Sequence, residues 1–176
     1  MPDYYPIRIQ RMPSGEGLPH PAKANPGDGG FDLSAAIPSG VTWHLEPGDR
    51  MLFPTGFAWA IPRGYVGQIW PRSKLANKQG INRLAGVVDH PYRGEVFALL
   101  INHHNWVWHV KRGDRIAQMV IAAIHPDDEV QEVAQLDSTV RGDHGITTVE
   151  PEDKNKPSVT TFLKYIGLLC SNPMRV

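Results

Sequence analysis

Short apolar runs alternate with turn residues through much of the chain. Between residues 37 and 70 the runs recur about every eight residues, with Pro- and Gly-containing turns between them. These runs are Val41–Leu45, Arg50–Phe53, Phe57–Ile61 and Tyr65–Trp70. Short strands at regular spacing are typical of a β-sandwich or a β-barrel. The pattern therefore predicts an all-β fold.

A second pattern predicts a β-hairpin across residues 86–101. The apolar residues that end at Val88 are followed by Asp89 and a Pro-aromatic pair, and then by the apolar run Val96–Ile101. Two β-like runs joined by a connection that contains Pro and Gly are typical of a hairpin. Asp89 and Tyr92 would then lie near its bend. Further along, Lys111–Ile121 is a turn that leads into an apolar strand.

The segment 102–110 carries three of the eight histidines: His103, His104 and His109. A metal cluster is one interpretation of this grouping. However, Trp106, Trp108 and Val110 alternate with other residues and share one face, which is typical of a strand. We therefore expect the histidines to be turn and surface residues.

Before residue 150, helical structure is expected only within residues 72–79, which contain good helix formers. Val159–Cys170 is apolar enough to form a short helix or strand. Near the beginning of the chain, the segment Pro13–Gly30 is rich in Pro and Gly, so a loop without a helix is predicted there. At the beginning of the chain, Tyr5–Arg11 alternates as a short strand does.

The end of the chain differs from the rest in composition. We predict one β domain over residues 1–148, with a polar, Gly-containing, flexible arm over residues 137–148. Residues 149–176 form a charged linker and a short extra apolar tail, for which the sequence indicates no function.

Composition narrows the classes of function. The chain has 176 residues, 41% hydrophobic and 20% charged, enough to form a globular domain with a core. Its 18 Lys and Arg balance its 18 Asp and Glu, so a general nucleic-acid binder is not expected. The single cysteine, Cys170, excludes an intramolecular disulfide. Without a signal-peptide pattern or a long apolar run, we expect a cytoplasmic protein with no membrane partner.

Several polar side chains lie where they can do chemistry. The carboxylate of Asp89, held at a turn, can orient a water molecule, and the ring of Tyr92 can pack against a flat ligand. Arg72, Ser73 and Lys74 provide successive hydrogen-bond donors at the start of the predicted helix, which suits an anion. A polar turn and a solvated helix start explain the same residues without any ligand.

Three more residues are candidates because of their surroundings. Asp32 follows a glycine-rich turn at the start of an apolar segment. Gln118 lies within an apolar run, where a buried amide needs partners. Arg141 lies among glycines and threonines that could wrap an anion. The structural alternatives are a plain turn for Asp32 and a solvent-facing side chain for Gln118.

Taken together, these segments resemble the dUTP pyrophosphatase (dUTPase) family, whose five motifs occur here in order. The first three are similar to Gly29–Ala35, Pro71–Ala76 and Gly86–Glu95. The fourth is matched closely by Arg112–Gln118, and the fifth less well by Arg141–Ile146. The resemblance covers residues 7–148.

This resemblance implies a jelly-roll-like subunit, the β-clip fold of the family, and a homotrimer. Three active sites would lie at the subunit interfaces, each built from motifs of different chains. The implied reaction is dUTP + water → dUMP + pyrophosphate. Mg²⁺ is the implied cofactor, because a hard cation neutralises triphosphate oxygens while it keeps several waters.

The resemblance also implies a role for each motif. Asp89 would orient and deprotonate the attacking water. Tyr92 would pack against the deoxyribose and exclude a 2′-hydroxyl. Backbone groups near the strand end would read the uracil edge, and the residues concerned are Gly86, Val87 and Val88.

The remaining roles concern the phosphates and the metal. Arg72, Ser73 and Gln118 would bind the phosphates together with Lys74, and Arg141 would close on the terminal one. Asp32 would reach Mg²⁺ through water.

The chain departs from the family pattern at several positions. Lys74 replaces a usual Gly, and Pro91 replaces a usual acid. In the fifth motif Ile146 stands where the family has a Phe that stacks on uracil. Base–aromatic stacking is worth about 1–3 kcal/mol, so its loss would weaken substrate binding about ten- to hundredfold.

Other functions stay open at this stage. Ile146 is compatible with a pyrophosphatase for a modified deoxypyrimidine triphosphate, or with a nucleotide-gated module that binds a partner protein. A dCTP deaminase is less expected, because residues 72–78 lack that family's second Ser and its following Arg. A purely structural trimer would have little need of Asp89, Tyr92 and Gln118 together.

Overall fold

The computed structural model describes residues 7–125 and 127–140. Residue contacts divide the chain into two compact units, Met1–Glu129 and Val130–Val176. The described strands and helices all lie in the first unit. They are β1 (Arg8–Arg11), η1 (Pro13–Gly15), β2 (Gly30–Ser34), β3 (Thr42–Leu45), β4 (Arg50–Ala60), β5 (Tyr65–Trp70), α1 (Ser73–Gln79), β6 (Ile81–Arg83), β7 (Val87–Val88), β8 (Glu95–Asn102), β9 (Trp108–Lys111) and β10 (Arg115–Ala123).

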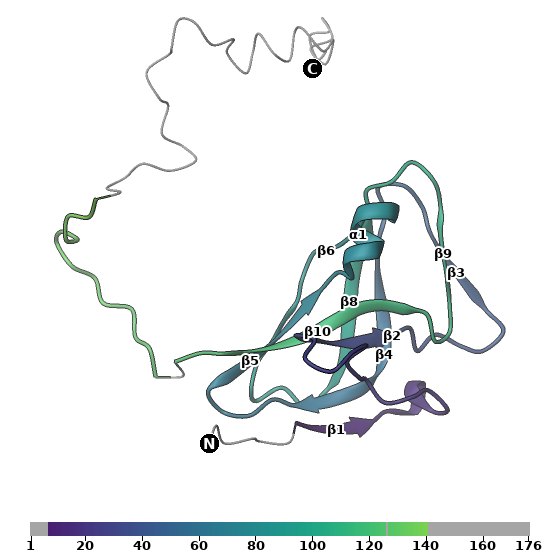
Figure 1. Cartoon of the computed structure of the whole chain (residues 1–176), viewed down its shortest axis with the longest axis horizontal. Helices are drawn as coiled ribbons and strands as arrows, with labels where there is room; N and C mark the ends of the chain where they lie inside the picture. The colour runs from purple at the N-terminus through teal and green to yellow at the C-terminus, as the bar shows by residue number, and fades with distance from the viewer. Residues whose placement is uncertain (1–6, 126, 141–176) are drawn as a thin grey trace, which may run out of the picture. The chain divides into compact units, whose positions relative to one another are not determined.

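The described strands form three antiparallel sheets (Figure 1). One has the order β1-β4-β8-β6, the second has the order β2-β10-β5-β7, and β3 pairs with β9 in a two-stranded ribbon. The prediction of a β-rich chain with one short helix is confirmed. Within the described residues, no helix is long and apolar enough to cross a lipid bilayer.

The core follows from the period of two along the strands. On β8 the side chains of Val96, Ala98 and Leu100 are buried, and residues between them are more exposed. Because alternate side chains of a strand point to opposite faces, this row faces the interior. There it joins one cluster with buried side chains of the other strands, including Phe53 and Trp59 of β4.

The predicted hairpin across residues 86–101 is wrong. β7 pairs with β5, whereas β8 pairs with β4 and β6 in a different sheet. The connection Asp89–Gly94 therefore leads from one sheet to another. Local sequence could not show this, because the partners of both strands are distant in the chain.

The two strands predicted at Arg50–Phe53 and Phe57–Ile61 are a single strand, β4. The Pro- and Gly-containing segment between them is an irregularity in the pairing with β8, not a turn. Gly56 has a φ of 79°, and a Cβ there would lie 2.4 Å from the Cα of Gly15. The buried hydroxyl of Thr55 donates to the carbonyl of Val96 at 2.6 Å. A glycine and a hydroxyl thus allow the strand to bend without ending.

Two smaller predictions also need correction. The loop predicted over Pro13–Gly30 contains the short 3₁₀ helix η1, whose first residue is Pro13. Proline is tolerated there because the first residues of a helix need no N–H donor. The second correction concerns the strand face predicted for Trp106, Trp108 and Val110. Trp106 lies outside β9 and is exposed, whereas Trp108 and Val110 are buried as expected.

Asn102 connects the end of β8 to the β3–β9 ribbon. Its side chain is fully buried. The Nδ2 group donates to the carbonyls of Leu45 at 2.9 Å and Trp106 at 2.8 Å. Its Oδ1 accepts from the N–H of His104 at 2.9 Å. One amide therefore satisfies backbone groups of β3 and of the connection that precedes β9.

We predict that Asn102→Ala lowers the free energy of unfolding by about 3 kcal/mol, because each buried backbone group left without a partner costs about 1–3 kcal/mol. Urea unfolding of the purified protein measures this loss. The control is Asn105→Ala, since Asn105 is exposed on the same connection and should change stability by less than about 0.5 kcal/mol. An equally small effect at Asn102 would contradict the prediction.

Candidate active site

Three charged side chains meet at the edge of the second sheet, and we call them the Asp32 cluster: Asp32, Arg72 and Arg115. The Nε group of Arg72 donates to Oδ1 of Asp32 at 2.8 Å, and its Nη2 to Oδ2 at 3.4 Å. Arg115 donates to Oδ2 from Nη1 at 3.1 Å. Only 15% of the Asp32 side chain is exposed, so both guanidinium groups compensate a largely buried charge.

Strand pairing brings Gln118 to the same place. Gln118 of β10 lies opposite Asp32 of β2 on one side and Trp70 of β5 on the other. Its Nε2 donates to the carbonyl of Pro71 at 3.0 Å, directly before Arg72. The Gln118 side chain is half-buried and hydrogen-bonded, and it lies on the face of β10 opposite to the buried Ala117 and Met119.

The start of α1 lies beside this cluster. Arg72 is the residue before the helix, with extended backbone, and Ser73 and Lys74 are its first two residues. Both are exposed. The helix ends at Gly80, whose φ of 60° is left-handed and whose N–H donates to the carbonyl of Leu75. The fold thus gathers Asp32, Arg72 and Gln118 and leaves the polar groups of Ser73 and Lys74 at the surface nearby.

The other predicted site residues line a groove of about 350 Å³, which we call the Asp89 groove. Its lining includes Gly86, Val87, Val88, Asp89 and Tyr92. The volume falls within the range typical of small-molecule sites, about 300–1,000 Å³. Asp89, Val87 and Tyr92 are exposed, whereas Val88 is buried. An acid, an aromatic ring and a strand edge therefore border one concave surface.

Tyr92 is held in place by its own connection. Its hydroxyl donates to the carbonyl of Glu95 at 2.8 Å, and its N–H donates to the carbonyl of Asp89 at 3.1 Å. A Cβ at Gly94 would lie 2.5 Å from the Tyr92 hydroxyl oxygen. Glycine at position 94 is thus required for this position of the ring.

The backbone of β7 is only partly available to a ligand. The carbonyl of Gly86 accepts from the N–H of Ile69 at 2.7 Å, so it is used within the sheet. β7 is the last strand in the order β2-β10-β5-β7. One row of backbone groups on Val87 and Val88 therefore faces away from β5, as at any sheet edge.

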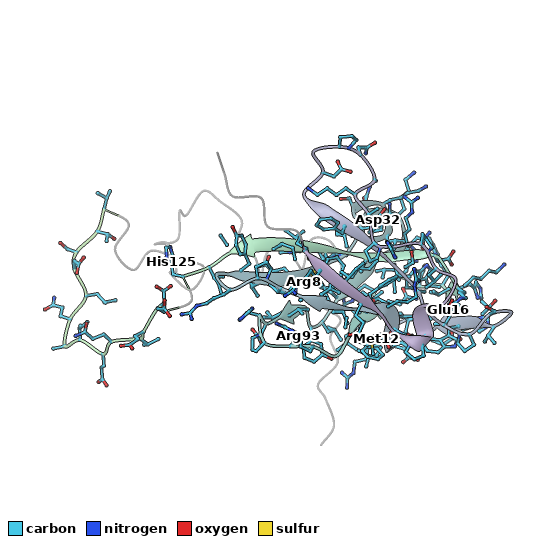
Figure 2. All side chains as sticks on the ribbon, turned by 90° about the horizontal axis from the view of Figure 1, so that it is seen from below. Arg8, Met12, Glu16, Asp32, Arg93 and His125 are labelled. Carbon is cyan, nitrogen blue, oxygen red and sulfur yellow. The ribbon has the colours of Figure 1, made fainter. Side chains whose placement is uncertain are left out.

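The Asp32 cluster and the Asp89 groove are far apart within one chain. β2 and β7 lie at opposite edges of a four-stranded sheet, and three strand spacings amount to about 14 Å. The two residues are also offset along the strand direction. Asp32 is level with Trp70 of β5, whereas Val88 is level with Gly67, an offset of about 10 Å. Figure 2 shows Asp32 and Arg93, a residue of the Asp89–Gly94 connection, on opposite sides of the ribbon.

Two predicted site residues, Arg141 and Ile146, lie outside the described residues. Conversely, Arg115 was not singled out by sequence reasoning. The pairing of β10 with β2 is irregular between Arg115 and Ala117, and this irregularity lets Arg115 reach the same carboxylate as Arg72. The sequence signal that could have identified Arg115 is its place in the segment Arg112–Gln118, three residues before Gln118.

The Asp32 carboxylate can meet a hard cation only through water, because Arg72 and Arg115 occupy most of it and oppose a second positive charge. Within the described residues, no three His, Cys, Asp or Glu side chains gather into a metal cage. A carboxylate has about four lone-pair positions, and the hydrogen bonds from Arg72 and Arg115 use three of them. One position is left, which suits a bridging water to Mg²⁺ but not a fully protein-bound metal.

The chain is similar in sequence to curated proteins of one family. Deoxyuridine 5'-triphosphate nucleotidohydrolase of Caulobacter vibrioides is 48% identical over 141 residues, which cover 79% of this chain and 90% of the relative. The protein of the same name from Beijerinckia indica is 45% identical over 141 residues, covering 79% and 88%.

Solved structures share the fold. The dUTPase of Staphylococcus bacteriophage 80alpha with dUPNHPP has a TM-score of 0.72 and 23% identity, over 84% of this chain and 100% of that one. The dUTPase of phage phi11 of S. aureus has a TM-score of 0.67 and 22% identity, over 77% and 100%. The family model named dUTPase matches residues 17–149. The chain therefore belongs to the dUTPase family and has its all-β fold.

Proposed function

We propose that the protein hydrolyses dUTP to dUMP and pyrophosphate. The observation that carries this proposal is that the chain has two complementary parts of a site, the Asp32 cluster and the Asp89 groove. The Asp32 cluster presents cationic and amide donors suited to phosphates, and the Asp89 groove presents an acid beside an aromatic ring. Relatives at 45–48% identity are named for the same reaction.

Asp89 is the proposed general base. Its carboxylate takes a proton from a water whose oxygen attacks the α-phosphorus, and the bond from that phosphorus to the bridging oxygen breaks as pyrophosphate leaves. A base of this kind needs a fixed position more than an altered pKa. The hydrogen bond from the N–H of Tyr92 to the carbonyl of Asp89 supports such a fixed position.

Tyr92 and β7 are proposed to select the nucleoside. The ring, anchored through its hydroxyl on the Glu95 carbonyl, packs against the deoxyribose and leaves no room for a 2′-hydroxyl. Crowding of this type costs about 1–3 kcal/mol, which disfavours UTP. The outward backbone groups of Val87 and Val88 bind the uracil edge.

Arg72, Ser73, Lys74 and Gln118 are proposed to bind the phosphates, and Arg141 to close on the terminal one. Arg72 uses two of its five N–H groups on Asp32, so it is oriented and keeps donors for phosphate oxygens. Gln118 uses one amide hydrogen on Pro71 and has a second. Asp32 would hold Mg²⁺ through water, and the ion would supply charge neutralisation at the phosphates.

The same geometry supports the proposed homotrimer. A water within hydrogen-bond reach of Asp89 must attack a phosphate whose neighbours are bound by Arg72 and Gln118. The distance across the sheet within one chain is too long for this. We infer that the Asp89 groove of one subunit faces the Asp32 cluster of another, in a ring of three chains closed by heterologous contacts.

Ile146 favours a second candidate, a pyrophosphatase for a modified deoxypyrimidine triphosphate. The residue replaces the aromatic side chain that the family places on uracil, so a base with a different substituent would meet an aliphatic surface. Pyrophosphate release from several deoxynucleoside triphosphates separates the two candidates.

Pyrophosphate release from dUTP, dTTP, dCTP and UTP, each with Mg²⁺ and with EDTA, tests the proposal. We expect metal-dependent turnover of dUTP alone. Asp89→Asn should lower kcat at least about a hundredfold, as is typical when a general base is lost, with dUTP binding and oligomeric state retained. Turnover that survives Asp89→Asn would refute the assignment of the base. Failure to hydrolyse any of the four would favour a modified substrate.

Asp32→Asn tests the role of the carboxylate. The substitution keeps the shape but removes the negative charge, so the Mg²⁺ concentration for half-maximal activity should rise at least about tenfold. A titration of activity against Mg²⁺ measures this shift. Asp28→Asn is the matched control, because Asp28 lies on the preceding exposed turn. An unchanged Mg²⁺ requirement with a higher KM would limit Asp32 to orienting Arg72.

Mixing two inactive variants tests the shared site. Trimers re-formed from equal amounts of Asp89→Asn and Arg72→Gln chains should regain about a quarter of the wild-type activity. The reason is that each interface combines two intact halves with a probability of one half times one half. Activity of the re-formed mixture measures this recovery, with each variant re-formed alone as the control. No recovery in verified mixed trimers would place both halves of the site in one chain.

A further inference from the structure

Two histidines face each other on the exposed side of the β3–β9 ribbon, away from the candidate active site. His44 of β3 and His109 of β9 are direct cross-strand partners. Their Nδ1 atoms are 2.7 Å apart, and the ring centroids are 4.8 Å apart with the ring planes nearly perpendicular. One ring therefore donates a hydrogen bond to the other. Both side chains are exposed.

The ribbon fixes the positions from which these side chains extend. Thr42 and Lys111 form the next pair on the same face, while Leu45 and Trp108 are a buried pair on the opposite face. Asn102 ties the carbonyl of Leu45 to the connection before β9. The strands below the two imidazoles are thus held by the core, so little backbone order has to be gained for both rings to bind one ligand.

The distance between the rings suits a shared metal ion. With metal–nitrogen bonds of about 2.0–2.1 Å, two nitrogens at a right angle lie about 2.9 Å apart, and at the tetrahedral angle about 3.3 Å apart. The observed 2.7 Å between the Nδ1 atoms requires only a small opening of the pair and rotation of both rings. Each imidazole then binds through Nδ1 and carries its proton on Nε2.

We propose that His44 and His109 form a two-histidine site for a transition-metal ion that prefers imidazole, such as Cu²⁺, Ni²⁺ or Zn²⁺. Water completes the coordination, because no third His, Cys, Asp or Glu joins the pair within residues 7–125 and 127–140. The ammonium group of Lys111 on the same face opposes a cation, so the site is an exchangeable one. The proposal does not depend on the proposed hydrolysis of dUTP.

The ligand chemistry separates this site from the one proposed at Asp32. Mg²⁺ prefers oxygen ligands and keeps its waters, and the Asp32 cluster offers it one carboxylate. Two neutral imidazoles are poor ligands for Mg²⁺ and good ones for the later transition metals. A large excess of Mg²⁺ should therefore leave the histidine pair free for a transition metal.

Calorimetric titration of untagged full-length protein with Ni²⁺, in excess Mg²⁺, tests the proposal. We expect one Ni²⁺ per chain. His44→Gln and His109→Gln should each weaken binding at least about tenfold, because loss of either ring removes the chelate. The double variant should be at most about threefold weaker than the single ones, because the two residues act as one unit.

The control is His103→Gln, because His103 is exposed on the connection before β9 but is not part of the His44–His109 pair. It should bind Ni²⁺ within about twofold of wild type. Loss of the His44 and His109 signals on addition of substoichiometric Cu²⁺, observed by NMR, would support the same assignment. Wild-type affinity in His44→Gln or His109→Gln, or an equal loss in His103→Gln, would overturn the proposal. Unchanged melting temperatures show that the variants are folded.

Discussion

The carboxylate of Asp32 is the constraint on which the candidate site depends. It is largely buried, and a buried charge is tolerated only when partners compensate its desolvation. Arg72 and Arg115 provide that compensation from segments 40 and 83 residues further along the chain. Since the carboxylate binds both guanidinium groups, it fixes where the start of α1 lies against β2 and β10. The phosphate-binding residues proposed here inherit their positions from this ion pair and from the bond between Gln118 and Pro71.

A second constraint is the placement of β7 and β8 in different sheets. The connection between them carries Asp89 and Tyr92 to the edge opposite the Asp32 cluster. Under the proposed function, such a chain holds two partial sites and completes a site only by association. Catalysis and assembly are then linked, because any condition that dissociates the subunits also removes the site.

The two proposed metal sites illustrate how ligand type divides metals within one fold. Oxygen donors and substrate phosphates suit Mg²⁺, while the imidazoles of His44 and His109 suit softer ions. The β3–β9 ribbon carries neither the Asp32 cluster nor the Asp89 groove (Figure 1). An ion bound on this ribbon would therefore leave the proposed catalytic residues unaltered.

The sequence by itself determined the elements with strong local signals. Short apolar runs between Pro- and Gly-containing turns predicted strands at Tyr65–Trp70 and Val41–Leu45, and helix formers predicted α1. Chemistry at turns singled out Asp32, Arg72 and Asp89, and the family resemblance gave them roles.

Only the tertiary structure decided which strands pair. Pairing separated β7 from β8, merged two predicted strands into β4, brought Arg115 to Asp32 and set His44 against His109. These outcomes depend on contacts between residues far apart in the chain. Local sequence sets the conformation of a segment, but its partners are chosen by burial and hydrogen bonding in the folded whole.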